Sequence, residues 1–63
     1  MTIEEVKKHL PSVKLNIDGQ IVEGKIAGRK LPFAQIRWGV TGHVEASWEL
    51  VTRCVNDDRP VIV

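Results

Sequence analysis

The sequence predicts an α+β fold: a small curled antiparallel β-sheet with an N-terminal helix and a second helix before a short last strand. Two observations predict it. Several short segments alternate apolar and polar residues and are separated by glycine-containing turns, which is typical of strands. Two other segments repeat their apolar residues at the helical period. The 63 residues, of which 43% are hydrophobic and 27% charged, fit one domain over residues 1–63.

The first helix is expected over residues 2–10. Thr2 is a favourable N-cap, and Glu5 three residues later completes a capping box. Pro11 ends the helix, because the residue before a proline disfavours helical geometry. A narrow apolar stripe runs along this helix and consists of Ile3, Val6 and Leu10. A helix this short is marginal alone, so its stripe must dock on the rest of the domain.

A β-hairpin is expected next, with strands over residues 13–17 and 20–26. The intervening Asp18-Gly19 pair is a strong signal for a two-residue type I′ turn. A two-residue turn pairs Leu15 with Val22 and places Val13 opposite Gly24. A glycine inside a strand predicts a bend or bulge there, as a tightly curled sheet requires.

A loop over residues 27–32, a strand over 33–38, a turn over 39–42 and a short strand over 43–46 follow. Alternation in the first of these strands separates two faces. The more apolar face, expected to contact the core, carries Ala34, Ile36 and Trp38. The opposite face carries Phe33, Gln35 and Arg37. In the short strand, Val44 and Ala46 are expected to point inward.

The second helix is expected over residues 48–55, with Ser47 as its N-cap. Its core-facing arc consists of Trp48, Val51 and Val55, with Leu50 and Cys54 beside it. The polar arc consists of Glu49, Thr52, Arg53 and Asn56. Residues 56–60 interrupt the helix, and Val61-Ile62-Val63 forms a last short strand, which we expect to be paired because a free apolar edge would aggregate.

This order of elements over residues 12–63 resembles the SH3-like small barrels, which include chromodomains and the small archaeal chromatin proteins. The resemblance lies in element order and size. It implies a five-stranded curled barrel. Chromodomains recognise methyl-lysine with a cage of three rings, whereas the aromatic residues here are Phe33, Trp38 and Trp48, and both tryptophans are expected in the core. The segment from Ser47 to Pro60 is also similar to the C-terminal parts of short bacterial proteins.

Charge is unevenly distributed along the chain. Residues 24–44 contain Lys25, Arg29, Lys30 and Arg37 but no acidic residue. A basic strand surface with an exposed ring is typical of small sheets that bind nucleic acid, where cations contact phosphates and the ring contacts bases. The sequence therefore predicts a non-enzymatic nucleic-acid-binding module, with DNA as the expected ligand. Its expected contact residues are Lys14, Lys25, Arg29, Lys30, Phe33 and Arg37.

Three alternatives stay open. The basic segment can be an ordinary solvated face whose acidic partners lie nearby in space. Phe33 can turn inward if a bulge follows Pro32. The protein can instead be a protein-interaction adaptor or a weak homodimer, which the net charge of +1 permits. The pI of about 7.9 is low for a dedicated nucleic-acid binder, for which roughly 9 is usual.

Other functions find little support in the residues. His9 and His43 lack neighbours at metal-ligand spacing, so neither a metal nor another cofactor is expected. Cys54 is expected to be a reduced core thiol, and no catalytic motif occurs. The charged N-terminal segment is unlike a signal peptide and no apolar run could cross a membrane, so we expect a cytoplasmic protein without a membrane partner.

Overall fold

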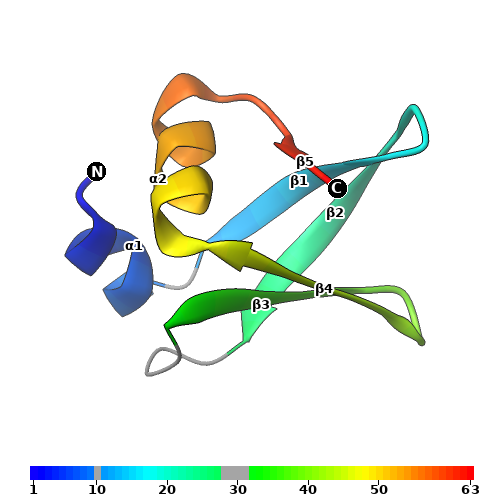
Figure 1. The fold of residues 1–63 in the computed structure, drawn as a ribbon, viewed down its shortest axis with the longest axis horizontal. Coiled ribbons are helices and arrows are strands. Elements are labelled where there is room, and N and C mark those ends of the chain that lie inside the picture. Colours follow the sequence, from blue (N-terminus) through cyan, green and yellow to red (C-terminus); the bar gives the residue numbers. More distant parts are fainter. Residues whose placement is uncertain (10, 28–31) are drawn as a thin grey trace.

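A computed structural model describes residues 1–9, 11–27 and 32–63, and it confirms the α+β fold (Figure 1). Its helices and strands are α1 (Ile3–His9), β1 (Ser12–Ile17), β2 (Gln20–Ala27), β3 (Phe33–Trp38), β4 (Gly42–Ser47), α2 (Trp48–Asp57) and β5 (Val61–Ile62). The second helix is longer than expected, because it continues through Asp57. The expected order of elements is therefore observed, with small shifts at their ends.

The five strands form one curled sheet in the order β4-β3-β2-β1-β5. The sheet has two free edges, β4 and β5, so it is a half-barrel and not a closed barrel (Figure 1). The neighbouring strands among β1 to β4 are antiparallel, as expected. The last strand is paired, also as expected, but it runs parallel to β1, with Leu15 opposite Val61. The sheet is therefore mixed, because the long connection through α2 brings the chain back in the direction of β1.

The Asp18-Gly19 turn sets the register of the first hairpin. Asp18 and Gly19 both have positive φ, at 49° and 85°, which is the geometry of the expected two-residue turn. The Asn16 side chain supports the turn, because its Oδ1 accepts a hydrogen bond of 3.2 Å from the Gly19 N–H. Leu15 lies opposite Val22, and the register continues without a bulge to the start of β1. The predicted register is thus confirmed.

Of the predicted bend or bulge at Gly24, the bulge is absent, because the register with β1 continues through this residue. Gly24 is buried on the inner face, where β2 passes from pairing with β1 alone to pairing with β3. A Cβ atom at this position would lie 2.5 Å from Ile36 Cγ2 and 2.9 Å from Leu15 Cδ1. Glycine is therefore required by the close approach of two core side chains, which the curl of the sheet brings over the β2 backbone.

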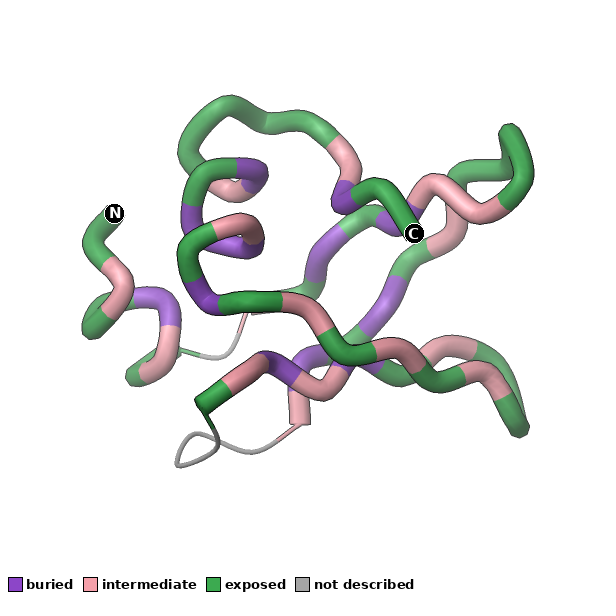
Figure 2. Tube along the Cα trace, viewed as in Figure 1, coloured by how far each residue is buried: buried purple, intermediate pink, exposed green. Residues whose placement is uncertain are grey.

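The core lies between α2 and the concave face of the sheet (Figure 2). Ser47 caps α2, since its Oγ accepts a hydrogen bond of 3.2 Å from the Leu50 N–H. Trp48 is 4% exposed, as expected of a core residue. Trp38 packs on the core but is only half-buried. This second expectation was wrong in degree, because Trp38 lies at the end of β3, and its ring covers Gly42 near the open side of the half-barrel.

The N-terminal helix α1 docks on α2, and one residue of the polar arc of α2, Thr52, is buried and not exposed as expected. Val6 is fully buried, and the Lys7 ammonium lies 5.3 Å from the centre of the Trp48 ring. Thr52 was expected among the solvent-facing residues, but it is 8% exposed. Its Oγ1 has no hydrogen-bond partner among the described residues. Thr52 is thus the buried member of an arc whose other residues, Glu49, Arg53 and Asn56, stay exposed, and α1 packs against the same helix.

Candidate nucleic-acid interface

Three of the expected basic contact residues lie on the outer face of the sheet. Alternation along each strand turns Lys14, Lys25 and Arg37 away from the core, and all three are exposed. Their neighbours Val13, on β1, and Ile36, on β3, are buried on the opposite face. The strands that carry them are adjacent in the sheet. The fold therefore brings together cations that are far apart in sequence.

Lys25 and Arg37 are the closest pair of these cations in the sheet. They lie directly opposite one another on β2 and β3, so their Cβ atoms are about 5 Å apart, as usual for facing residues. Neither forms an ion pair within the described ranges. Together with Glu23, Ala27, Trp38 and Gly39 they line a depression of about 380 Å³. Two positive side chains thus face solvent side by side, and no described acidic residue lies within ion-pair distance of either.

The same row continues onto β4, which sequence reasoning missed. His43 lies opposite Arg37, so Lys25, Arg37 and His43 cross three neighbouring strands on the outer face. His43 is exposed. The signal that could have found it is the Gly39–Gly42 turn, since a short turn there pairs the residues on either side of it. His43 adds a hydrogen-bond donor beside the two cations.

The register also brings acidic residues to this face. Glu23 lies opposite Lys14, and Glu45 lies opposite Gln35. Both glutamates are exposed. The basic segment, which contains no acidic residue, therefore has acidic residues of neighbouring strands beside it in the sheet. The positively charged part of the outer face is limited to the area around Lys25 and Arg37. The two-residue hairpin already implies the Lys14–Glu23 pairing, so the acidic residue beside Lys14 could be predicted from the sequence.

Phe33 lies on the outer face by register. It pairs with the exposed Ser47, while the next residue, Ala34, is fully buried. The inward alternative therefore does not apply, but the ring is half-buried and offers less stacking surface than an exposed ring would. Arg29 and Lys30, the remaining expected contact residues, lie outside the described residues.

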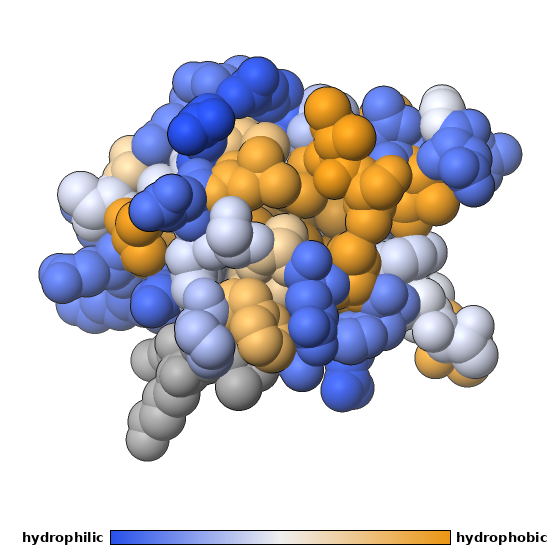
Figure 3. Space-filling view, viewed as in Figure 1, coloured by the Kyte–Doolittle hydropathy of each residue, from blue (hydrophilic) through white to orange (hydrophobic). Residues whose placement is uncertain are grey.

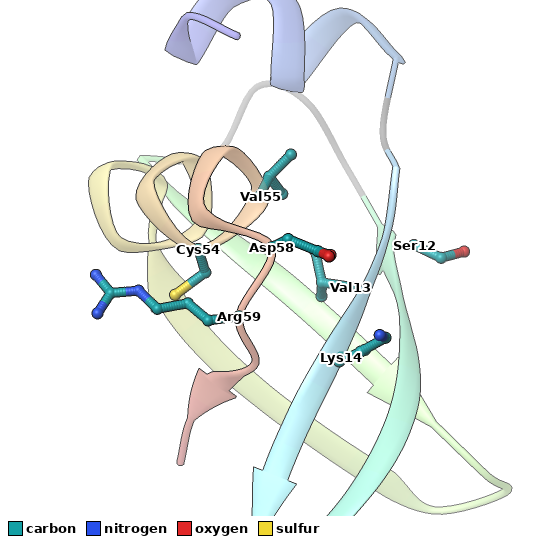
Figure 4. A pocket seen from close by; sticks show the side chains of 7 residues that line it. All are labelled: Ser12, Val13, Lys14, Cys54, Val55, Asp58 and Arg59. Carbon is teal, nitrogen blue, oxygen red and sulfur yellow. The ribbon is translucent and has the colours of Figure 1, made fainter.

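A second, smaller cleft lies between β1 and the end of α2 (Figure 4). Its volume is about 150 Å³, whereas small-molecule sites usually enclose about 300–1,000 Å³. Cys54 lines it and is 4% exposed, so this thiol behaves as a core residue. The Arg59 guanidinium points away from β1 and contacts Asp57 at 3.4 Å. The polar groups around this cleft thus do not converge on one point.

The described part of the chain contains no group of three or more His, Cys, Asp or Glu residues arranged to hold a metal ion. Neither α1 nor α2 has the length and apolar character needed to cross a bilayer.

Comparison with protein-family models, with curated proteins and with solved structures finds no match for this chain. The likeness to SH3-like small barrels therefore rests on element order alone, and a shared architecture would not by itself assign a function.

Proposed function

We propose that this chain is a small non-enzymatic binding module that binds nucleic acid, in the first place DNA, through the outer face of its sheet. The observation that supports the proposal is the Lys25–Arg37 pair, two exposed cations directly opposite each other on neighbouring strands. Like charges in facing positions destabilise a sheet. An anion bound between them would remove this repulsion, so the pair favours a ligand with closely spaced negative charges.

A nucleic-acid backbone fits this chemistry better than a single small anion. The positive surface is a shallow depression on a curled sheet, and Lys14 and His43 extend it beyond the central pair. Phosphates repeated along a strand can contact several such groups at once, and each contact releases counterions. The half-buried Phe33 ring at the far end of β3 is the expected contact for a base.

The expected affinity is low. The net charge is only +1, and Glu23 and Glu45 share the face with the cations. A protein that neutralises a few phosphates binds in the range of non-specific complexes, about 10⁻⁴ to 10⁻⁶ M at physiological salt. The proposal is therefore a module with backbone-directed binding, in which bases add little discrimination.

The test is a titration of labelled duplex DNA, single-stranded DNA and RNA at about 50 mM salt. Wild type is compared with Lys25→Ala and Arg37→Ala, and with Lys8→Ala as a matched control, because Lys8 is exposed on α1, away from the sheet face. Binding that weakens in the first two variants and not in the control supports the proposal. Absence of binding to all three ligands would favour the adaptor alternative, in which an open sheet edge or the amphipathic helices bind a protein partner.

A further inference from the structure

The strand β4 is a long free edge. It contains six residues, Gly42–Ser47, and lies at the end of the sheet. Within residues 1–9, 11–27 and 32–63 its only strand partner is β3. The other edge, β5, has two residues and follows Pro60. A free edge presents unpaired backbone N–H and C=O groups, which makes it a template for another strand.

The side chains of β4 alternate in a way that suits pairing with itself. His43 and Glu45 are exposed on the outer face, whereas Val44 and Ala46 are half-buried on the inner face. When two sheets join edge to edge, residues of one face must meet residues of the same face. An antiparallel pair of β4 strands related by a two-fold axis can thus be centred on His43, on Val44 or on Glu45.

Only one of these three registers is complementary. Centred on Glu45, the strands place two carboxylates directly opposite each other, which is unfavourable. Centred on His43, they place two imidazoles together and leave each Glu45 opposite Thr41. Centred on Val44, they place each His43 opposite the partner's Glu45, an imidazole donor facing a carboxylate acceptor. The inner face then matches Val44 with the partner's Val44, and Ala46 with the partner's Gly42.

We propose that the occupant of this edge is a second copy of the same chain, paired antiparallel through β4 with Val44 at the two-fold axis. Glu45 disfavours the Glu45-centred register, where it would face a second carboxylate. The same residue stabilises the Val44-centred register, where it faces the partner's His43. The net charge of +1 offers little long-range repulsion between copies. In Figure 3 the apolar surface gathers mainly over α2, β5 and β1 and reaches β4 only in part, and Val44 belongs to the apolar residues that pack on the core. The dimer continues the sheet from one copy into the other.

The test measures association of the full chain without nucleic acid, so its result does not depend on the proposed function. Sedimentation equilibrium is carried out up to roughly 1 mM protein, where dissociation constants near that value are detected. Wild type should form a reversible dimer. Glu45→Lys should weaken association roughly tenfold, because the symmetric interface loses two complementary pairs. Glu23→Lys makes the same charge change on the outer face of β2 and should leave association unchanged.

A mixing experiment tests the register itself. His43→Glu alone places two carboxylates opposite each other at both contacts, and it should weaken self-association at least as much as Glu45→Lys. When the His43→Glu and Glu45→Lys chains are mixed, the glutamate introduced at position 43 faces the lysine introduced at position 45. The other contact keeps a native His43–Glu45 pair. Native mass spectrometry should therefore find the mixed dimer in excess over either self-paired dimer.

Three results would overturn the proposal: a wild type that stays monomeric at the highest concentration, a dimer that Glu45→Lys does not weaken, or a mixture with no excess of mixed dimers. Circular dichroism verifies that each variant is folded. If Glu45→Lys is not folded, Glu45→Gln replaces it, since this change removes the charge and keeps the shape of the side chain.

Discussion

Lys25 and Arg37 lie directly opposite one another on β2 and β3, both exposed, and neither forms an ion pair within the described ranges. Two facing cations cost stability in an isolated sheet and favour binding of an anion. Substitution at this position should therefore change stability and nucleic-acid binding in opposite directions if the pair serves binding.

Replacing Lys25 with Gln should separate the two effects. The substitution removes the repulsion with Arg37 and keeps the aliphatic stem, so the free energy of unfolding should stay the same or rise by up to about 0.5 kcal/mol. Nucleic-acid binding should weaken at the same time. Urea unfolding and a DNA titration on the same samples measure both, with Lys8→Gln as control. A clear loss of stability would show that Lys25 is structural.

Gly24→Ala should destabilise the domain by about 1–3 kcal/mol, because the added methyl collides with Ile36 and Leu15 inside the core. Urea unfolding measures the change. Gly39→Asn is the control: Gly39 has a φ of 63°, a Cβ atom added there would meet no atom within 4 Å outside its chain neighbours, and asparagine tolerates this conformation. If the two variants lose the same stability, close packing at Gly24 is not the reason for the glycine.

Truncation of the two tryptophans should reduce the free energy of unfolding by different amounts. Trp48→Ala should cost about 3–5 kcal/mol, which is comparable with the whole stability of a domain of this size. Trp38→Ala should cost less, since this side chain is half-buried. Fluorescence quenching by acrylamide in Trp38→Phe and Trp48→Phe, each with one tryptophan left, gives an independent readout. The remaining indole should be quenched more strongly in Trp48→Phe, and the opposite order would contradict the packing described here.

Thr52→Val should stabilise the protein by about 1 kcal/mol. The Thr52 hydroxyl is buried without a hydrogen-bond partner among the described residues, and valine has nearly the same shape without the desolvated polar atom. Thermal unfolding by circular dichroism measures the gain. Thr41→Val, at an exposed turn position, is the control. A loss of stability at position 52 would indicate that the hydroxyl is hydrogen-bonded in solution.

The local parts of the fold could be predicted because they depend on neighbouring residues. Asp18-Gly19 determines a turn, the turn determines a register, and the register places Lys14 and Lys25 on one face. Ser47 likewise determines where α2 begins. These features need only backbone geometry and the alternation of side chains.

The remaining features depend on contacts between distant elements. Thr52 looks solvent-facing in the sequence but is buried in the fold, and the direction of β5 is set by where α2 ends. The half-burial of Trp38 follows from a sheet that does not close. Within the candidate site, the hairpin turn already implies the acid opposite Lys14, whereas the acid opposite Gln35 depends on how β3 pairs with β4. No pattern within a single strand contains this information.

The salt dependence of DNA binding tests the central claim most directly. With two to five cations in contact with phosphates, log K should fall against log salt with a slope of roughly −2 to −4.5. Arg37→Ala should reduce the magnitude of that slope by about one unit, because one phosphate contact is lost, while urea unfolding remains unchanged. A slope near zero, or a slope that Arg37→Ala leaves as it is, would contradict nucleic-acid binding through the outer face of the sheet.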